Sequence, residues 1–279
     1  MALVNLLSLT KPKITLLNIF TAVASYFLAS GPVNGVPHLI FSGYLSVGGA
    51  SALNHYLDKD IDSKMRRTAG RPLPSGKIKP RAAFILGVSM VVLSVIYSAL
   101  TLNLLASFFI FLGVAIYVLV YTVWLKRRSV WNIVIGGAAG SCAPLAGWAA
   151  SGHEFTLAPL LLAGLVFLWT PGHFWALASR AFKDYEAAGI PMLPVVKGVE
   201  LTSKASLISN VLSVIAALLL SLFVKNYIVY LAVVLPVSAL LIYESIRPCI
   251  RYSPSAAWRA FKISSPWLFV VFAASALSI

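Results

Sequence analysis

The sequence predicts an all-α integral membrane protein, and three features of its composition and patterning indicate this class. Of its 279 residues, 59% are hydrophobic and only 11% are charged, whereas a soluble domain usually carries about 25% charged residues. The apolar residues form long runs, as membrane-spanning helices require. The short alternating segments of a membrane β-barrel are not the pattern here. Too little polar surface remains for a water-soluble protein of this size.

Nine apolar stretches are each long enough to cross a hydrocarbon core of about 30 Å as a helix. The first follows Lys11 and Lys13 like the apolar part of a signal peptide, but it is long enough to span and more spans follow. No Pro/Ser-rich linker, low-complexity tract or repeat divides the chain, so we expect one membrane domain, 1–279. The expected spans are 14–30, 38–57, 82–101, 104–124, 131–150, 157–178, 205–224, 227–246 and 261–278.

The basic residues predict the orientation of the chain in the membrane. The net charge of +14 would suggest nucleic acid in a soluble protein. Here the Lys and Arg residues lie in short segments between apolar runs, where they set topology. With the N-terminus inside, Lys225 is the only one of the 22 that falls outside. We therefore expect a cell-membrane protein with a cytoplasmic N-terminus and an external C-terminus, and no nucleic-acid partner.

Two common kinds of site are not indicated. The two cysteines, Cys142 and Cys249, are far apart and form no metal-like pair, so we expect neither a disulfide nor thiol chemistry. No Walker-type phosphate-binding loop occurs, so an ATP-driven machine is not indicated.

The eight acidic residues contain the candidate metal ligands. Asp58, Asp60 and Asp62 form one group, and Asp184 and Glu186 form a second. Both groups fall at the predicted cytoplasmic ends of spans two and six. Carboxylates at a membrane-helix end are costly unless they are paired or bind a metal. A solvated loop with balanced charges explains such a group equally well, and only spacing separates the two explanations.

The spacing favours a metal site. Asn54, Asp58 and Asp62 recur every four residues, so on a continuing helix they share one face. Three hard oxygen ligands on one face suit Mg²⁺, which prefers carboxylates together with substrate phosphate oxygens. Asp60 points roughly to the other side, and we assign it a structural role.

A basic, turn-rich stretch follows at 65–76. Arginines that bind phosphate oxygens through both guanidinium nitrogens, next to acids that hold a metal, form a diphosphate site. We assign Arg67 and Arg71 to it, whereas Arg66 and Arg81 are expected only to set topology.

The residues now identify a resemblance. The sequence Asn54–Gly76 resembles the first signature of the UbiA-type intramembrane prenyltransferases, and Tyr121–Arg127 resembles that family's second basic element. The sequence Phe167–Leu177, with Pro171-Gly172-His173 at its centre, is similar to the heme farnesyltransferase branch. So are Asp184–Pro194 and the opening Leu9–Lys13. The resemblance covers nearly the whole chain.

The resemblance implies a fold and a reaction. The fold would be nine transmembrane helices around a central cavity, with the site capped by cytoplasmic loops. The reaction would transfer a farnesyl group from farnesyl diphosphate to a vinyl carbon of heme b, with Mg²⁺ as cofactor and water adding at the neighbouring carbon. The implied metal ligands are Asn54, Asp58, Asp62 and Asp184. The implied diphosphate-binding residues are Arg67, Arg71, Lys126 and Arg127.

Two further residues are assigned from the same motifs. His173 is either a packed, hydrogen-bonded residue or a catalytic residue that contacts heme. The other expected catalytic residues are Asp58, Asp62 and Asp184. Tyr185 is expected to be a hydrogen-bond partner in the site. Membrane lipid and heme-oxidising or terminal-oxidase assembly proteins are the expected partners.

Two other functions stay open. The first is another UbiA-type enzyme with a quinone-precursor or lipid acceptor. Many relatives carry a second aspartate where this chain has Arg180, which argues against a phenolic acceptor. The second is a transporter or a heme carrier without catalysis. Transporters place ionisable residues near the membrane midplane, whereas the acids here gather at one membrane face, which favours an active site.

Overall fold

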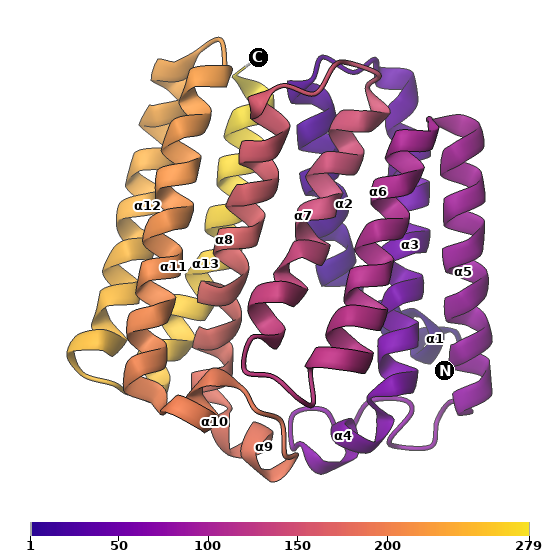
Figure 1. Ribbon diagram of the computed structural model, residues 1–279, viewed down its shortest axis with the longest axis vertical. Helices are drawn as coiled ribbons and strands as arrows, with labels where there is room; N and C mark the ends of the chain where they lie inside the picture. The colour runs from indigo at the N-terminus through magenta and orange to yellow at the C-terminus, as the bar shows by residue number, and fades with distance from the viewer. Residues whose placement is uncertain (1, 279) are drawn as a thin grey trace.

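The computed structural model describes residues 2–278, and within this range the chain forms helices and no strand. Long helices stand side by side (Figure 1). Each predicted span corresponds to one of them, with ends that differ by up to seven residues, most at the starts of α11 and α13. The long helices of this range are α2 Pro12–Leu28, α3 Val36–Leu57, α5 Pro80–Thr101, α6 Leu104–Ala115 continued by η2 Ile116–Leu125, α7 Asn132–Ala150, α8 Leu157–Arg180, α11 Val199–Leu219 continued by η3 Leu220–Phe223, α12 Tyr227–Ile250 and α13 Pro254–Leu277.

Seven of these helices are long and apolar enough to cross a membrane, which makes the chain a multi-pass membrane protein. The two others are α2, an apolar helix of 17 residues, and α3. The polar residues Asn54 and His55 lie in the last turn of α3, where a site is expected.

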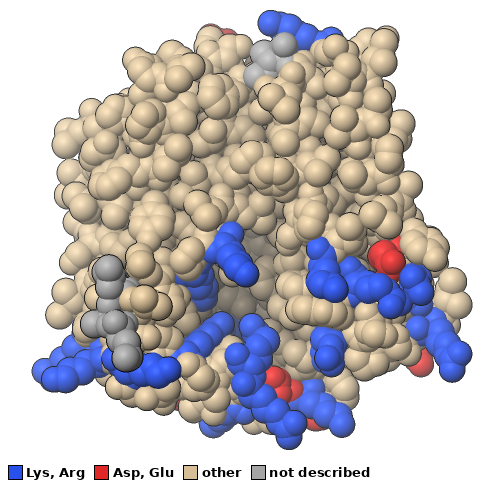
Figure 2. All heavy atoms as spheres, turned by 180° about the vertical axis from the view of Figure 1, so that it is seen from behind, with Lys and Arg blue, Asp and Glu red and all other residues tan. Residues whose placement is uncertain are grey.

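Four short helices gather at one end of the bundle (Figure 1). They are α1 Ala2–Leu9, α4 Lys59–Lys64, α9 Phe182–Ala187 and α10 Leu193–Lys197. Figure 2 shows that most of the Lys and Arg side chains of the visible face lie at this end, around a hollow in the surface. The predicted cytoplasmic loops are therefore brought together.

A large apolar core joins α2, α8, α11, α12 and α13. Its largest side chains satisfy their polar atoms inside the protein, as buried Trp and Tyr require. Trp267 Nε1 donates to Ser238 Oγ over 2.9 Å, and the Tyr230 hydroxyl donates to the carbonyl of Ala217 over 2.7 Å. This core fixes α13 against α8, which becomes important for the site.

The helices α2 and α7 approach each other at backbone distance. A Cβ atom on Gly147 would overlap the backbone carbonyl of Ala22, and Ser25 Oγ donates to the carbonyl of Pro144 over 2.7 Å. Small residues allow this approach, which is how membrane helices gain packing without a hydrophobic driving force.

We expect Gly147→Ala to destabilise the fold by about 2 kcal/mol or more, because the new methyl group meets backbone, which cannot rotate away. Gly164→Ala is the matched control, since a Cβ there meets nothing within 4 Å. Thermal unfolding of the two purified variants in one detergent measures the difference. Equal melting temperatures would contradict the backbone contact.

Candidate active site

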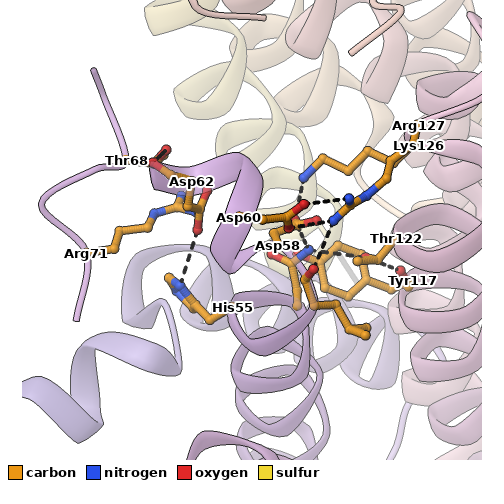
Figure 3. Close-up of polar contacts among 12 residues, drawn as sticks. His55, Asp58, Asp60, Asp62, Thr68, Arg71, Tyr117, Thr122, Lys126 and Arg127 are labelled. Carbon is orange, nitrogen blue, oxygen red and sulfur yellow. Dashed lines mark hydrogen bonds and ion pairs between the residues drawn. The ribbon is translucent and has the colours of Figure 1, made fainter. Parts of the chain in front are cut away.

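The joint between α3 and α4 carries the acidic motif. Asp58 ends α3 with φ −95° and ψ 6°, so the helix bends there. The i to i+4 backbone hydrogen bonds nevertheless continue, from Asp58 N to the carbonyl of Asn54 and from Asp62 N to that of Asp58. Asp58 is 1% exposed and Asp62 3%, whereas the Asp60 side chain is 51% exposed. The Asp60 carboxylate is thus exposed, as expected of a residue off the buried face, but it lies beside Asp58 and not on the opposite side of the helix (Figure 3).

The bend separates the buried acids into two groups (Figure 3). Asp62 lies beside His55 and Arg71 on one side of α4, and Asp58 lies beside Lys126 on the other. Each buried carboxylate is thus held by its own cation. Their convergence on one metal ion stays a prediction.

Asp58 is the centre of the first group. Lys126 Nζ donates to Asp58 Oδ2, and Asn54 Nδ2 donates to the same oxygen over 2.6 Å. The second carboxylate oxygen, Oδ1, is buried and has no hydrogen-bond partner. An unpaired buried carboxylate oxygen is costly, so this atom is suited to receive a ligand.

The position of Lys126 depends on the wide turn of η2. Residues 116–125 form a π-helix, and Lys126 N closes it by donating to the carbonyl of Tyr121 over 2.8 Å. Such π segments are frequent at functional sites. Burial lowers the pKa of Lys126, but Tyr121 and the Asp58 carboxylate outweigh burial and raise it above the ordinary lysine value. Lys126 is therefore charged.

Lys11 is a site residue that spacing and charge did not predict. Its Nζ donates to Asn54 Oδ1 over 2.7 Å and to the Tyr117 hydroxyl over 3.1 Å. Its backbone is left-handed, with φ 47°, a conformation that costs a non-glycine residue about 1 kcal/mol or more and that clusters at functional sites. Burial, with the nearby cations Arg71 and Lys126, lowers the pKa of Lys11 to about 7.

Asp62 is the centre of the second group. Arg71 Nη1 donates to both Asp62 oxygens, over 2.8 and 2.7 Å. His55 Nδ1 lies 3.8 Å from Asp62 Oδ2. Thr68 Oγ1 donates to the Asp62 carbonyl over 3.0 Å and so fixes the loop that carries Arg71. The predicted diphosphate-binding Arg71 is thus next to the predicted metal ligand.

Arg127 holds the joint from outside. It donates to both oxygens of Asp60, over 2.7 and 2.8 Å, and to the Leu57 carbonyl over 3.0 Å, which caps the end of α3. The hydrogen bond from Arg127 lowers the pKa of Asp60. Both side chains are largely exposed, so a role of Arg127 in diphosphate binding stays a prediction.

Asp184, on α9, faces the loop after α4. Arg67 N lies 3.4 Å from Asp184 Oδ2 and donates to it. Tyr185 is buried in an apolar cluster with Ile61 and Met65, which packs α9 against α4. The second acidic motif is therefore brought to the first. Tyr185 acts here by packing, and its role as a hydrogen-bond partner stays a prediction.

His173 lies elsewhere, inside α8. Its Nδ1 shares a hydrogen bond of 2.5 Å with Ser264 Oγ, and its ring stacks on Trp169 at 4.4 Å between centroids. The structure thus shows a packed, hydrogen-bonded histidine. Contact with heme stays a prediction.

The first group suits a divalent cation and an anion together. Among residues 2–278, no three His, Cys, Asp or Glu side chains lie close enough to form a metal site by themselves. The unpartnered Oδ1 of Asp58 is nevertheless a hard oxygen donor of the kind that Mg²⁺ prefers. Lys11, Lys126 and Arg71 outnumber the two buried carboxylates, so the site carries excess positive charge that favours a polyanion such as diphosphate.

Comparison with known proteins gives the family. The profile of the UbiA prenyltransferase family matches residues 18–273. Protoheme IX farnesyltransferase 1 of Cenarchaeum symbiosum is 43% identical over 98% of this chain and 95% of its own. Protoheme IX farnesyltransferase of Sulfurisphaera tokodaii is 41% identical over 96% and 91%.

Solved structures share the fold. The apo structure of a UbiA homologue from Aeropyrum pernix superposes with a TM-score of 0.78 at 20% identity, covering 94% of this chain and 96% of that one. A UbiA homologue from Archaeoglobus fulgidus, bound to DMAPP and Mg²⁺, gives 0.72 at 18% identity, covering 99% and 100%. With a matching profile over most of its length and close full-length relatives, the chain belongs to the UbiA prenyltransferase family.

Proposed function

We propose that this protein transfers a farnesyl group from farnesyl diphosphate to a vinyl group of heme b, giving heme O. Binding of the diphosphate donor is supported above all by the buried Asp58 carboxylate. One of its oxygens is held by Lys126 and Asn54, and the other has no hydrogen-bond partner. The acceptor half is supported by the full-length similarity to protoheme IX farnesyltransferases.

The donor must lose diphosphate, and the chain must stabilise the charge that develops. The allylic C–O bond breaks, its electron pair goes to the leaving oxygen, and a farnesyl cation forms. Mg²⁺ bound at Asn54, Asp58, Asp62 and Asp184 would supply Lewis-acid stabilisation. Positioned cations give the same kind of stabilisation. Lys11, Lys126 and Arg71 form the inner set, with Arg67 and Arg127 at the rim.

In the acceptor step, the farnesyl cation is joined to a vinyl group of heme. The terminal carbon of the heme vinyl group attacks the farnesyl cation and forms a C–C bond. The positive charge moves to the carbon beside the porphyrin ring, where water adds and loses a proton. The product carries a hydroxyethylfarnesyl group, and its mass exceeds that of heme by one farnesyl group and one hydroxyl group. A largely apolar bundle protects the first cation from premature hydration.

The ion pairs of this structure prepare the site for its ligands. Lys126 holds Asp58 and Arg71 holds Asp62 in place. Asp58 and Asp62 would hold the metal ion, and Lys126 and Arg71 would then be free for phosphate oxygens. This exchange keeps every buried charge paired, which burial in an apolar bundle demands.

We further propose the membrane arrangement. The whole chain, 1–279, is one domain that crosses the cell membrane nine times, with its N-terminus and active site in the cytoplasm and its C-terminus outside. The gathering of Lys and Arg at one end supports this orientation (Figure 2). Partners would be membrane lipid and heme-oxidising or terminal-oxidase assembly proteins.

A direct assay tests the function. Purified protein in lipid, given farnesyl diphosphate, Mg²⁺ and heme b, should convert heme to a product that mass spectrometry shows to be heavier by one farnesyl group and one hydroxyl group. Removal of Mg²⁺ should stop the reaction. Prenylated 4-hydroxybenzoate with unchanged heme would assign the chain to another acceptor class. Heme retention without any product would favour a carrier.

Substitution of single aspartates distinguishes the acids that act in the site from those that only add charge to a loop. Asp58→Ala should lower turnover by roughly 100-fold or more, because the metal ion that stabilises the leaving group would lose a buried ligand. Asp60→Ala is the matched control from the same motif, and its exposed carboxylate makes us expect a loss of only a few-fold. The assay above measures both. Similar losses would show that the two acids do not differ in role.

The lowered pKa of Lys11 predicts proton uptake on donor binding. A lysine is charged below its pKa, so with a pKa of about 7 Lys11 is largely neutral at pH 8 and largely charged at pH 6. Diphosphate favours the charged form, so binding at pH 8 should take up a proton at this residue and binding at pH 6 should not.

Calorimetric titration with farnesyl diphosphate, in buffers of different ionisation enthalpy, counts these protons. Lys11→Arg stays charged throughout and corrects for protons taken up by the diphosphate itself. An identical proton count for the wild type and Lys11→Arg at pH 8 would disprove the assignment.

A further inference from the structure

A stack of aromatic rings connects α8 with α13. Trp169 stacks on His173 with centroids 4.4 Å apart, and His173 lies 4.4 Å from Phe261. Phe261 in turn stacks on Trp258, at 5.1 Å and 21° between planes. We name these four rings, Trp169, His173, Phe261 and Trp258, the Trp258 wall. None of them is used by the donor chemistry.

Ser264 of α13 fixes the inner end of the Trp258 wall. Its hydroxyl shares the 2.5 Å hydrogen bond with His173 Nδ1, and its carbonyl accepts from Trp169 Nε1 over 3.0 Å. The outer end is open, because Trp258 is 39% exposed. The wall is therefore a rigid apolar surface whose last ring is available to a ligand.

The outer end of the wall lies on the part of α13 that α2 does not cover. Higher on α13, Phe269 stacks on Phe20 of α2 at 4.2 Å, and both helices run from the basic end upwards (Figure 1). Seven residues earlier on each helix stand Lys262 and Lys13, which are therefore at about the same height. Because α2 begins at Pro12, nothing of α2 covers α13 below this level.

The start of α2 connects this level with the donor site, because Lys13 lies two residues after Lys11. Lys11 stands just before the start of α2 and its Nζ reaches Asn54. The surface is hollowed near the basic end, with Lys and Arg at the rim (Figure 2). A ligand that stacks on Trp258 and pairs with Lys13 would thus lie near the residues that hold the diphosphate.

The charges beside the wall are cations without carboxylate partners. Lys262 Nζ lies 6.0 Å from the centroid of the Trp258 ring. Both Lys262 and Lys13 are exposed, and neither takes part in an ion pair within residues 2–278. A flat aromatic surface beside two free ammonium groups is complementary to a flat π-system that carries carboxylates.

We propose that the Trp258 wall is the acceptor subsite and binds a planar tetrapyrrole dicarboxylate. The macrocycle stacks on Trp258, and its carboxylates pair with Lys262 and Lys13. This inference rests on the proposed function, because heme b is the tetrapyrrole dicarboxylate of that reaction. It adds residues of α13 and Lys13 of α2 to a site otherwise built from Lys11, the end of α3, α4 with the loop after it, the end of η2, and α9.

Binding in the absence of a donor tests the proposal without turnover. Protoporphyrin IX, titrated into protein in lipid nanodiscs and followed by absorbance, should bind about tenfold more weakly to Trp258→Ala than to the wild type. Trp258→Phe should retain most of the affinity. Trp131→Ala, which removes another exposed indole, should have no effect.

The carboxylates are tested separately. Lys262→Glu should weaken protoporphyrin IX about tenfold at low salt, whereas Lys225→Glu should not. Protoporphyrin IX dimethyl ester, which lacks the charges, should bind the wild type and Lys262→Glu equally. The affinity of farnesyl diphosphate with Mg²⁺ should be unchanged in Trp258→Ala.

The outcomes separate this inference from the proposed function. If the wild type binds no protoporphyrin, the subsite is wrong, whereas the assay with heme b decides the proposed function. If the wild type binds it and neither Trp258→Ala nor Lys262→Glu changes the affinity, only the subsite is wrong. If Trp258→Ala weakens farnesyl diphosphate instead, the wall holds the prenyl chain and the proposal is overturned.

Discussion

The rest of the structure depends on the pairing of two buried carboxylates with cations from distant parts of the chain. Asp58 and Asp62 lie almost wholly out of solvent, where an unpaired charge is costly. Lys126 arrives from the end of η2 and Arg71 from the loop after α4, and Lys11 binds Asn54 from the start of α2. Four segments must therefore meet at one end of the bundle before the acids can be charged. The same end is where an apolar protein has access to water and to ionic substrates.

Features that depend on local interactions could be predicted from the sequence, whereas features that depend on long-range contacts could not. Apolar runs are local, and the long helices lie where those runs predict them. The four-residue spacing of Asn54, Asp58 and Asp62 is also local. It predicts one shared face, which holds for Asn54 and Asp58, joined by a hydrogen bond, but not for Asp62. The bend at Asp58 was not predictable from spacing, and it directs Asp58 and Asp62 to opposite sides of α4.

Long-range pairings were harder to predict. In the sequence, Lys11 looks like a lysine that only sets membrane topology. The left-handed backbone before Pro12 turns its side chain to Asn54. The signal present in the sequence was the motif Leu9–Lys13, which carried a resemblance but no geometry. Arg127 likewise has the charge for diphosphate binding, yet its partner, Asp60, lies 67 residues away and caps the joint with it. Charge alone does not show which arginine binds ligand and which binds protein.

The excess of cations over carboxylates makes the charge of the site adjustable. Lys11, Lys126 and Arg71 repel one another, and the lowered pKa of Lys11 arises from that repulsion together with burial. Loss of one proton from Lys11 relieves the strain without moving the backbone. Arrival of a polyanion reverses the balance, so that the same three groups are all favoured in their charged forms. A site that carries too much positive charge when empty therefore gains affinity for diphosphate from the relief of its own repulsion, and a low dielectric strengthens this effect.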